Sequence, residues 1–261
     1  MSFNADLFDR TASEYDEWPP FFRILGAKLV EFANLSVGGS ALDIGAGKGA
    51  VTLPALAAVG PLGHVTAVDV SERMVQHLRG YGRPNLNVLH QDITETTLPD
   101  ASHDHAVSGF TLHILRDLTQ ALVQIHRVLK DHGTLSWSRP GGHPDASEWE
   151  NSYGRIYETF AGRLPRVPSE MADESDYEAL FQAAGFDVCE QITVPVRISV
   201  GGAEEYWAWT QTHGARWLTD QLSADDAADF KNAVVDSLLK SHPTQGCDIM
   251  VAPLLTKLRR S

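Results

Sequence analysis

The stretch from Ser40 to Arg139 most constrains the fold, because short apolar runs alternate there with longer segments of helical periodicity. This alternation is typical of strand-helix-strand units around a parallel sheet. The expected strands cover residues 41–44, 64–69, 86–90, 105–108 and 134–138, and the expected helices cover residues 50–59, 72–80 and 118–130. The pattern predicts an α/β fold with a doubly wound sheet.

The segments outside this core carry different patterns. Residues 1–35 contain a polar, aromatic-bearing lead and an amphipathic stretch over 21–32, which predict N-terminal lid helices. Aromatic residues at near-helical spacing predict a helical cap insertion over 140–172. A second cap insertion, over 202–243, is predicted from helical stretches at 203–212 and 224–240. The pattern also predicts a helix at 176–184. The sheet is completed by a strand within 188–200 and a final antiparallel strand over 249–258. We expect one domain over residues 1–261, with the cofactor-binding core at 40–139.

Charge and composition limit the partners of the chain. A formal net charge of −13 repels polyanions, so nucleic acid is a poor candidate partner. The two cysteines lie far apart in sequence, which is not the dense framework of a small secreted domain. No apolar stretch reaches the roughly 20 residues needed to span a bilayer, and no secretory leader pattern opens the chain. We expect a soluble cytoplasmic protein without a membrane partner, and both a monomer and a homodimer remain open.

A glycine-rich loop follows the first expected strand. Residues 45–50, Gly-Ala-Gly-Lys-Gly-Ala, satisfy the dinucleotide-binding pattern and equally an S-adenosylmethionine-binding pattern that begins at Asp43. Asp69, at the end of the second expected strand, suits the ribose of either cofactor. A carboxylate at Asp43 would repel a pyrophosphate and attract an ammonium group. Asp43 therefore favours S-adenosylmethionine, with Asp92 after the third strand placed to meet an adenine amino group.

Further motifs follow in the order and spacing of one enzyme family. They are Phe8-Asp9-Arg10 with Tyr15-Asp16, residues 42–49, Ala67-Val68-Asp69 with Ser71 and Met74, Gln91-Asp92-Ile93, residues 105–113 and residues 129–135. Over residues 8–139 the chain resembles the class I S-adenosylmethionine-dependent methyltransferases, in particular the small-molecule branch related to quinone-biosynthesis enzymes (methyltransferase type 11-like). The resemblance implies a Rossmann-like sheet, S-adenosylmethionine as cofactor, S-adenosylhomocysteine as product, and a biosynthetic role in methylating a small molecule, with a specialised metabolite as one candidate.

The resemblance also implies which residues contact the cofactor. The methionine portion would meet Gly45, Ala46 and Gly47, with Asp43 holding its ammonium directly or through water. Asp69 would bind the ribose, Met74 would pack on adenine, Asp92 and the Ile93 backbone would meet the adenine ring, and Tyr15 would close over the cofactor. Gly109 and Phe110 would lie beside the sulfonium, and Val70 and Gln91 complete the expected cofactor-binding set.

The acceptor side is less determined by the sequence. His113 follows the fourth strand, where it is the first candidate for a general base, and His213 is the second. One aromatic group forms either an apolar acceptor pocket or the ordinary core of the cap: Trp149, Tyr153, Tyr157, Trp207 and Trp209. His103 and His105 flank Asp104, but side chains alternate on a strand, so no metal site is expected.

Several rival functions stay open at this point. They are a non-methylating reaction such as cyclisation on the same cofactor-binding fold, a NAD-dependent oxidoreductase, a binding-only descendant, and a protein or RNA methyltransferase. Asp43 disfavours the oxidoreductase, and the negative charge disfavours RNA.

Overall fold

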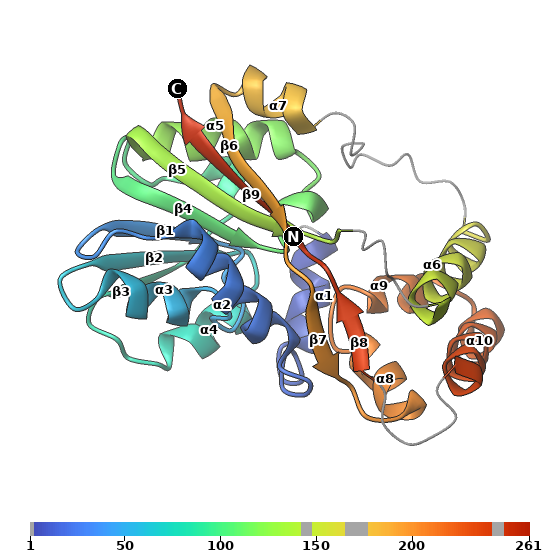
Figure 1. The fold of residues 1–261 in the computed structure, drawn as a ribbon. Coiled ribbons are helices and arrows are strands. Elements are labelled where there is room, and N and C mark those ends of the chain that lie inside the picture. The colour runs from blue at the N-terminus through green and yellow to red at the C-terminus, as the bar shows by residue number, and fades with distance from the viewer. Residues whose placement is uncertain (1–2, 142–147, 165–176, 242–247) are drawn as a thin grey trace.

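A seven-stranded sheet forms the centre of the molecule in a computed structural model, which describes residues 3–141, 148–164, 177–241 and 248–261. The strand order is β3 (Leu86–His90), β2 (His64–Asp69), β1 (Ser40–Ile44), β4 (His103–Gly109), β5 (Leu129–Arg139), β9 (Leu254–Arg260) and β6 (Phe186–Thr193) (Figure 1). Only β9 runs antiparallel to its neighbours in this sheet. The mostly parallel, doubly wound sheet with a late antiparallel strand is therefore confirmed. Its order reverses between β1 and β4, the position where ligands bind in such sheets.

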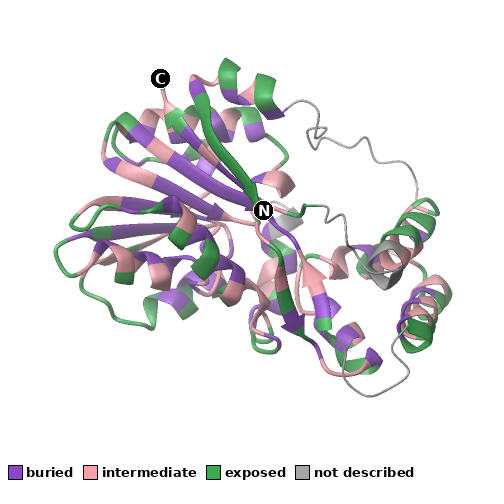
Figure 2. Cartoon of the chain, viewed as in Figure 1, coloured by how far each residue is buried: buried purple, intermediate pink, exposed green. Residues whose placement is uncertain are grey.

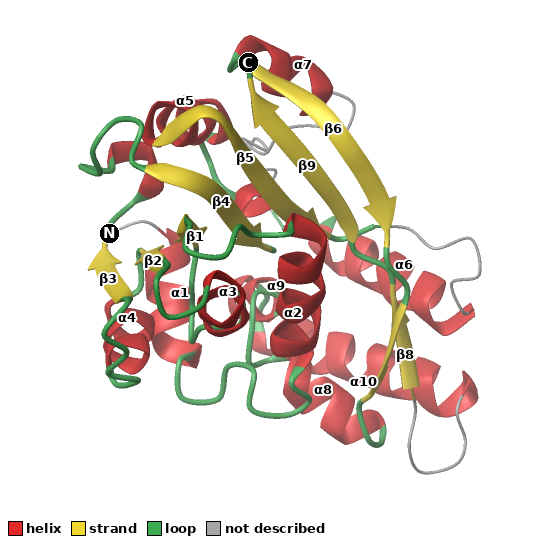
Figure 3. Cartoon of the chain, turned by 60° about the vertical axis from the view of Figure 1, so that its left-hand side comes forward, coloured by secondary structure: helices red, strands yellow, loops and turns green. Residues whose placement is uncertain are grey.

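Helices cover both faces of the sheet (Figure 3). One face carries α2 (Phe21–Ala33), α3 (Thr52–Val59) and α4 (Glu72–Arg79), and the other carries α5 (Leu118–Val128) and α7 (Tyr177–Ala183). The apolar side chains alternate accordingly, since Ala41 packs with α2 and α3 while Leu42 packs with α5. Figure 2 shows the central strands buried between these layers. Two short 3-10 helices follow strand ends, η1 (Ile93–Glu95) and η2 (Leu112–Ile114).

A second group of helices stands beside the sheet and has its own apolar cluster. It contains α6 (Glu148–Ala161), α8 (Ala203–Thr210), α9 (Arg216–Gln221) and α10 (Ala224–Ser241), with the short pair β7 (Val196–Ser199) and β8 (Asp248–Val251). We call this group the insertion (Figure 1). Tyr206, Trp209 and Phe230 are buried in its core. The N-terminal helix α1 (Phe3–Thr11) lies between the insertion and the sheet.

A two-stranded ribbon joins the insertion to the sheet. The expected strand within 188–200 is divided into β6 and β7, and the expected strand over 249–258 is divided into β8 and β9. Pro195 and Pro253 lie in the two interruptions, and proline cannot donate a ladder hydrogen bond. The Val194 N–H donates to the Pro253 carbonyl at 3.1 Å, so the two arms stay together across the break.

Two other sequence expectations need correction. The helix expected over 118–130 ends at Val128, because Leu129 already has extended backbone angles and begins β5. The short helix α9 was not expected at all. The division into lid, core and cap remains a prediction.

Candidate active site

The carboxyl ends of β1 and β4 meet at one small cavity. The glycine loop after β1 forms its floor, and Tyr15 and Phe22 cover it from the N-terminal segment and α2. The lining residues are Tyr15, Phe22, Gly26, Gly45, Ala46, Gly47, Ala50, Val51, Gly109 and Phe110. Six of the residues expected to contact the cofactor lie together in this lining: Tyr15, Gly45, Ala46, Gly47, Gly109 and Phe110.

Asp43 is fully buried at the end of β1. Its Oδ2 accepts a hydrogen bond from the Thr52 hydroxyl at 2.5 Å, but its buried Oδ1 has no partner within the part of the chain that the structure describes. Burial raises the pKa of Asp43 to about 7, against the opposing hydrogen bond from Thr52. A buried carboxylate oxygen without a partner is costly, and an ammonium group or a water molecule would satisfy it. Asp43 therefore fits the expected amino-acid portion of the cofactor.

The glycine loop requires backbone angles that favour glycine. Gly45 and Gly47 have φ values of 70° and 53°. At Gly45 a Cβ would also lie 2.2 Å from the Thr111 hydroxyl oxygen. The loop therefore presents backbone to the cavity, as the sequence predicts.

Asp69 fixes the other side of the same loop. Its Oδ2 accepts from the Gly47 N–H at 2.7 Å, and its Oδ1 accepts from the Ser71 N–H at 2.8 Å. Burial raises the pKa of Asp69, and these two backbone hydrogen bonds oppose the shift. The sequence predicts a ribose contact here, but not that the same carboxylate holds the loop and the start of α4. The Asp-x-Ser spacing, typical of a side chain that accepts from the backbone two residues on, is the signal that could have indicated it.

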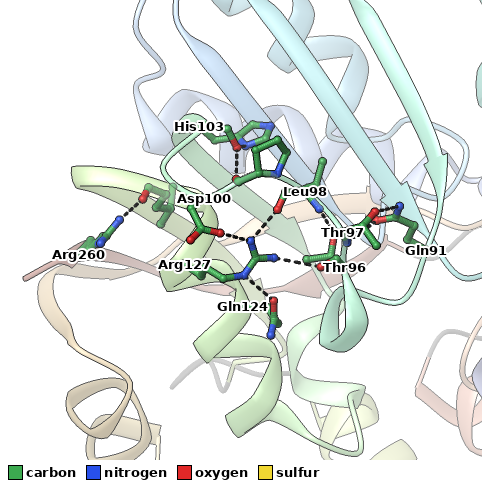
Figure 4. A network of polar contacts seen from close by, with 12 residues as sticks. Gln91, Thr96, Thr97, Leu98, Asp100, His103, Gln124, Arg127 and Arg260 are labelled. Carbon is green, nitrogen blue, oxygen red and sulfur yellow. Dashed lines mark hydrogen bonds and ion pairs between the residues drawn. The ribbon is translucent and has the colours of Figure 1, made fainter.

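Three further residues of the expected set directly follow the end of β3. The Asp92 Oδ1 accepts from the Thr94 N–H at 2.9 Å and caps η1. The Gln91 side chain donates to Thr97 Oγ1 and accepts from Thr96 Oγ1, both at 2.9 Å, so it holds its own loop in place (Figure 4). Ile93 is buried, as is Met74 on α4. Their contacts with a cofactor, like that of Val70, stay predictions.

The N-terminal segment lies across the mouth of the cavity. The Tyr15 ring stacks on Phe22, with centroids 4.9 Å apart and an angle of 6° between the planes. Asp16 caps α2 by accepting from the Phe22 and Arg23 N–H groups at 2.8 and 3.0 Å. In α2, a Cβ on Gly26 would lie 2.3 Å from the Ala50 carbonyl oxygen, so glycine lets this helix approach the loop closely. Tyr15 therefore lines the cavity beside the glycine loop, and its closure over the cofactor stays a prediction.

Two consecutive residues tie this segment to both sides of the site. Asp9 accepts from the Ser71 hydroxyl at 2.5 Å and from the Arg73 N–H at 3.1 Å, at the start of α4. Arg10 pairs with Asp220 of α9 at 2.7 Å. The sequence identifies Asp9 and Arg10 as part of a motif without giving them a role. The structure shows that they connect the cofactor side to the insertion.

A cluster of aromatic rings and two histidines adjoins the cavity through Phe22 and Phe110. Phe110 packs against Phe22 at 6.0 Å between centroids and against His113 at 6.2 Å. His213, in the turn after α8, packs edge-on against Phe22 at 5.7 Å and against Trp209 at 4.8 Å. We call these five residues the aromatic wall.

Both histidines of the aromatic wall are neutral and incompletely hydrogen-bonded. Burial lowers the pKa of each to about 4, and for His113 the charge of Arg139 adds to this effect. His113 Nδ1 and His213 Nε2 are buried and have no hydrogen-bond partner among the described residues. Buried polar atoms of this kind are uncommon in folded proteins and are candidates for ligand contacts.

The other predicted acceptor residues lie deeper in the insertion. Tyr153 packs on Tyr206 at 5.9 Å, and Tyr157 and Trp207 pack on Phe230 at 6.4 and 5.4 Å. The side chain of Trp149 falls outside the described residues. In the insertion, Trp209 packs on His213, and His213 packs on Phe22, which lines the cavity. Sequence reasoning missed Phe22, for which an aromatic pair at the start of an amphipathic helix was the available signal.

His103 and His105 lie at the opposite end of β4 from the cavity. His105 Nε2 accepts from the Ser36 N–H at 3.1 Å, and Asp104 between them pairs with Lys130 at 2.8 Å. Over the described ranges, no three or more histidine, cysteine, aspartate or glutamate side chains are grouped as metal ligands. None of the helices in those ranges is long and apolar enough to cross a membrane.

Comparisons with known proteins agree with this geometry. Residues 42–137 match the family described as "Methyltransferase domain". Nocamycin O-methyltransferase from Saccharothrix syringae is 27% identical over 85% of this chain and 86% of its own length. A demethylmenaquinone methyltransferase from Lactobacillus johnsonii is 31% identical over 61% of this chain and 70% of its own length. A crystal structure of a SAM-dependent methyltransferase from Aquifex aeolicus superposes with a TM-score of 0.55 at 23% identity, covering 71% and 92% of the two chains. The glycine loop, the carboxylates at the strand ends and these likenesses together place the chain in the class I S-adenosylmethionine-dependent methyltransferases.

Proposed function

We propose that this enzyme methylates an oxygen atom of a small, largely apolar acceptor, and that His113 accepts the proton which that oxygen loses. The observation that carries the proposal is the buried, unpartnered Nδ1 of His113, whose ring packs against Phe110, a residue that lines the cavity. A specialised metabolite is the kind of acceptor that this wall suits.

Two observations support a small acceptor: the aromatic side chains that cover the site, and the net charge of the chain. Tyr15 and Phe22 line the cavity together with the glycine loop, and a site covered in this way suits a metabolite better than a macromolecule. A net charge of −13 opposes nucleic acid. The relatives above are named for nocamycin and demethylmenaquinone, both small molecules. We assign residues 140–172 and 202–243 the role of a cap over this acceptor.

The chemistry that we propose divides among a few side chains. When bound, S-adenosylmethionine supplies a methyl group already activated by its sulfonium. Asp43 and Asp69 hold and orient the cofactor, while Tyr15 and Phe110 exclude water. The acceptor oxygen forms a bond to the methyl carbon as the carbon–sulfur bond breaks, and its proton passes to a ring nitrogen of His113.

A pKa of about 4 makes His113 a weak base, so this role requires its pKa to rise during transfer. Before transfer, burial and the positive charge of Arg139 keep the ring neutral and able to accept. Methyl transfer removes the sulfonium charge from the site, and the loss of a nearby cation raises the pKa of an imidazole. His113 therefore becomes a stronger base as the reaction proceeds.

The test is an assay with methyl-labelled S-adenosylmethionine and a panel of hydroxylated aromatics, quinols, enols and matched amines. We expect S-adenosylhomocysteine release with the label in an O-methyl group. Label on nitrogen or carbon would overturn oxygen as the acceptor atom. An acceptor that rearranges while the label stays on the cofactor would replace methyl transfer with the alternative, a non-methylating reaction such as cyclisation.

A further inference from the structure

We infer that His213 is a neutral hydrogen-bond donor to the acceptor, and that the acceptor carries a carbonyl oxygen near the oxygen that is methylated. This inference rests on the proposed function. It assigns His213 a role different from that of a base, which is the role that the sequence alone indicates.

The position of the proton on His213 follows from a backbone hydrogen bond. The Ala215 N–H donates to His213 Nδ1 at 3.3 Å, and a backbone amide can only donate. Nδ1 is therefore an acceptor, and in the neutral ring the proton lies on Nε2. His213 presents an N–H group, not a lone pair, at its free nitrogen.

The turn that carries His213 is fixed by further backbone hydrogen bonds. The His213 carbonyl accepts from the Arg216 N–H at 3.0 Å, and the Gly214 carbonyl accepts from the Trp217 N–H at 3.1 Å. The ring is held edge-on to Phe22 and packs on Trp209. The direction of the Nε2–H group is therefore set by the protein before an acceptor arrives.

The Nε2 atom is buried without a partner among the described residues. An unsatisfied buried donor destabilises the folded state, and the group that would satisfy it is an oxygen with a free lone pair. Among the described residues, the side chains in ring contact with His213 are those of Phe22 and Trp209, which supply no such oxygen. An acceptor molecule within the aromatic wall would supply it.

The two histidines of the aromatic wall then differ in chemistry. His113 accepts a proton from the hydroxyl that is methylated, and His213 donates to a second oxygen that keeps its lone pairs. A carbonyl conjugated with that hydroxyl, as in an enol of a dicarbonyl compound or a hydroxyaryl ketone, meets both demands. The negative charge on the carbonyl oxygen increases as the conjugated hydroxyl loses its proton. The hydrogen bond from His213 Nε2–H to that oxygen therefore strengthens during the reaction.

The first experiment observes His213 directly. Long-range proton–nitrogen correlation spectra of the 15N-histidine-labelled protein, with His213 assigned by its loss in His213→Gln, report which nitrogen carries the proton. We expect the Nε2–H form of a neutral ring at pH 7. A proton on Nδ1, or a charged ring at that pH, overturns the inference whether or not any acceptor is methylated.

The second experiment separates donor, base and packing roles. His213→Phe keeps a ring but no donor, while His213→Gln keeps an N–H donor at similar reach but cannot act as a base. His64→Phe makes the same change at an exposed histidine at the far end of β2 and serves as the control. KM, kcat and acceptor binding to the S-adenosylhomocysteine-loaded protein are measured with a hydroxyaryl ketone and with the matched phenol that lacks the carbonyl.

We expect His213→Phe to weaken binding and raise KM for the ketone by about tenfold or more. His213→Gln should recover most of that loss. For the phenol that lacks the carbonyl, KM and binding should be the same in the wild type and in every variant. Equal impairment of the Gln and Phe variants would indicate a base, and equal ketone binding by all variants would indicate packing only; either result overturns the inference. A wild-type protein that methylates nothing in the panel contradicts the proposed function, while the binding comparison still decides the role of His213.

Discussion

The proposed cofactor side and the proposed acceptor side of this site are built in different ways. On the cofactor side, Asp69 accepts from two backbone N–H groups, and Asp43 from one neighbouring hydroxyl. On the acceptor side, aromatic rings surround two histidines that each have a buried nitrogen without a described partner. The first side comes from consecutive strand ends, and the second from the start of α2, residues 110–113 and the turn after α8. The contrast indicates that the donor position is fixed by backbone, and the acceptor position by side chains from separate segments.

The largest expected effect is at His113, and it tests whether the two sides act independently. His113→Phe keeps a ring against Phe110 but removes both nitrogens, so we expect kcat to fall by roughly 10²- to 10⁴-fold, the usual contribution of a general base. Cofactor affinity, measured by calorimetry, should stay within about threefold if the sides are independent. His132→Phe, at an exposed histidine of β5, is the control. Parallel losses of turnover and cofactor affinity would contradict the separation.

A smaller effect is expected at Asp69. Asp69→Ala should weaken S-adenosylmethionine binding by roughly 1 to 3 kcal/mol, through lost hydrogen bonds to ribose and a loosened Gly47. Asp69→Asn retains an acceptor oxygen and should lose less. Calorimetric titration gives the affinities, with Asp131→Ala at the exposed start of β5 as a control. Unchanged affinity in the alanine variant would remove Asp69 from the cofactor site.

The pH dependence of cofactor binding tests Asp43. Its pKa of about 7 is raised by burial, and a bound ammonium favours the carboxylate, so binding at lower pH must release a proton. Affinity should therefore fall as pH drops below 7, by up to about tenfold per unit. Titrations in buffers of different ionisation enthalpy count the released proton. Asp43→Asn should flatten this part of the profile; a profile that keeps its slope in that variant would assign the proton to another group.

The smallest effect concerns the link between the two sides. Arg10 pairs with Asp220 through a side chain that is 55% exposed, so the pair should contribute only about 0.2 to 1 kcal/mol. A double-mutant cycle of Arg10→Ala and Asp220→Ala, followed by chemical unfolding and by KM for the acceptor, measures this coupling. We expect cofactor affinity to be unchanged. A coupling well above 1 kcal/mol, or a loss of cofactor affinity, would show that the two sides act as one unit.

The sequence predicts that Asp43, Gly45 and Asp69 lie close together, but not that Phe22 meets His213, for a physical reason. Asp43, Gly45 and Asp69 lie at the ends of consecutive strands, so the period of the strands and the order of the motifs already determine their proximity. Phe22 and His213 are separated by most of the chain and meet only through tertiary packing. Local pattern also failed at Leu129, where an apolar stripe continued past the end of α5 into β5.

The ribbon of β6 to β9 has a consequence for how such a protein could acquire a new substrate. Ser199 and Asp248 are paired neighbours, so the chain leaves and re-enters the ribbon at almost one point. Everything between them, including Trp209 and His213, could be exchanged for another segment while the register of β9 with β5 is kept. Recombination at this single junction would then transplant part of the acceptor specificity and leave the cofactor machinery untouched.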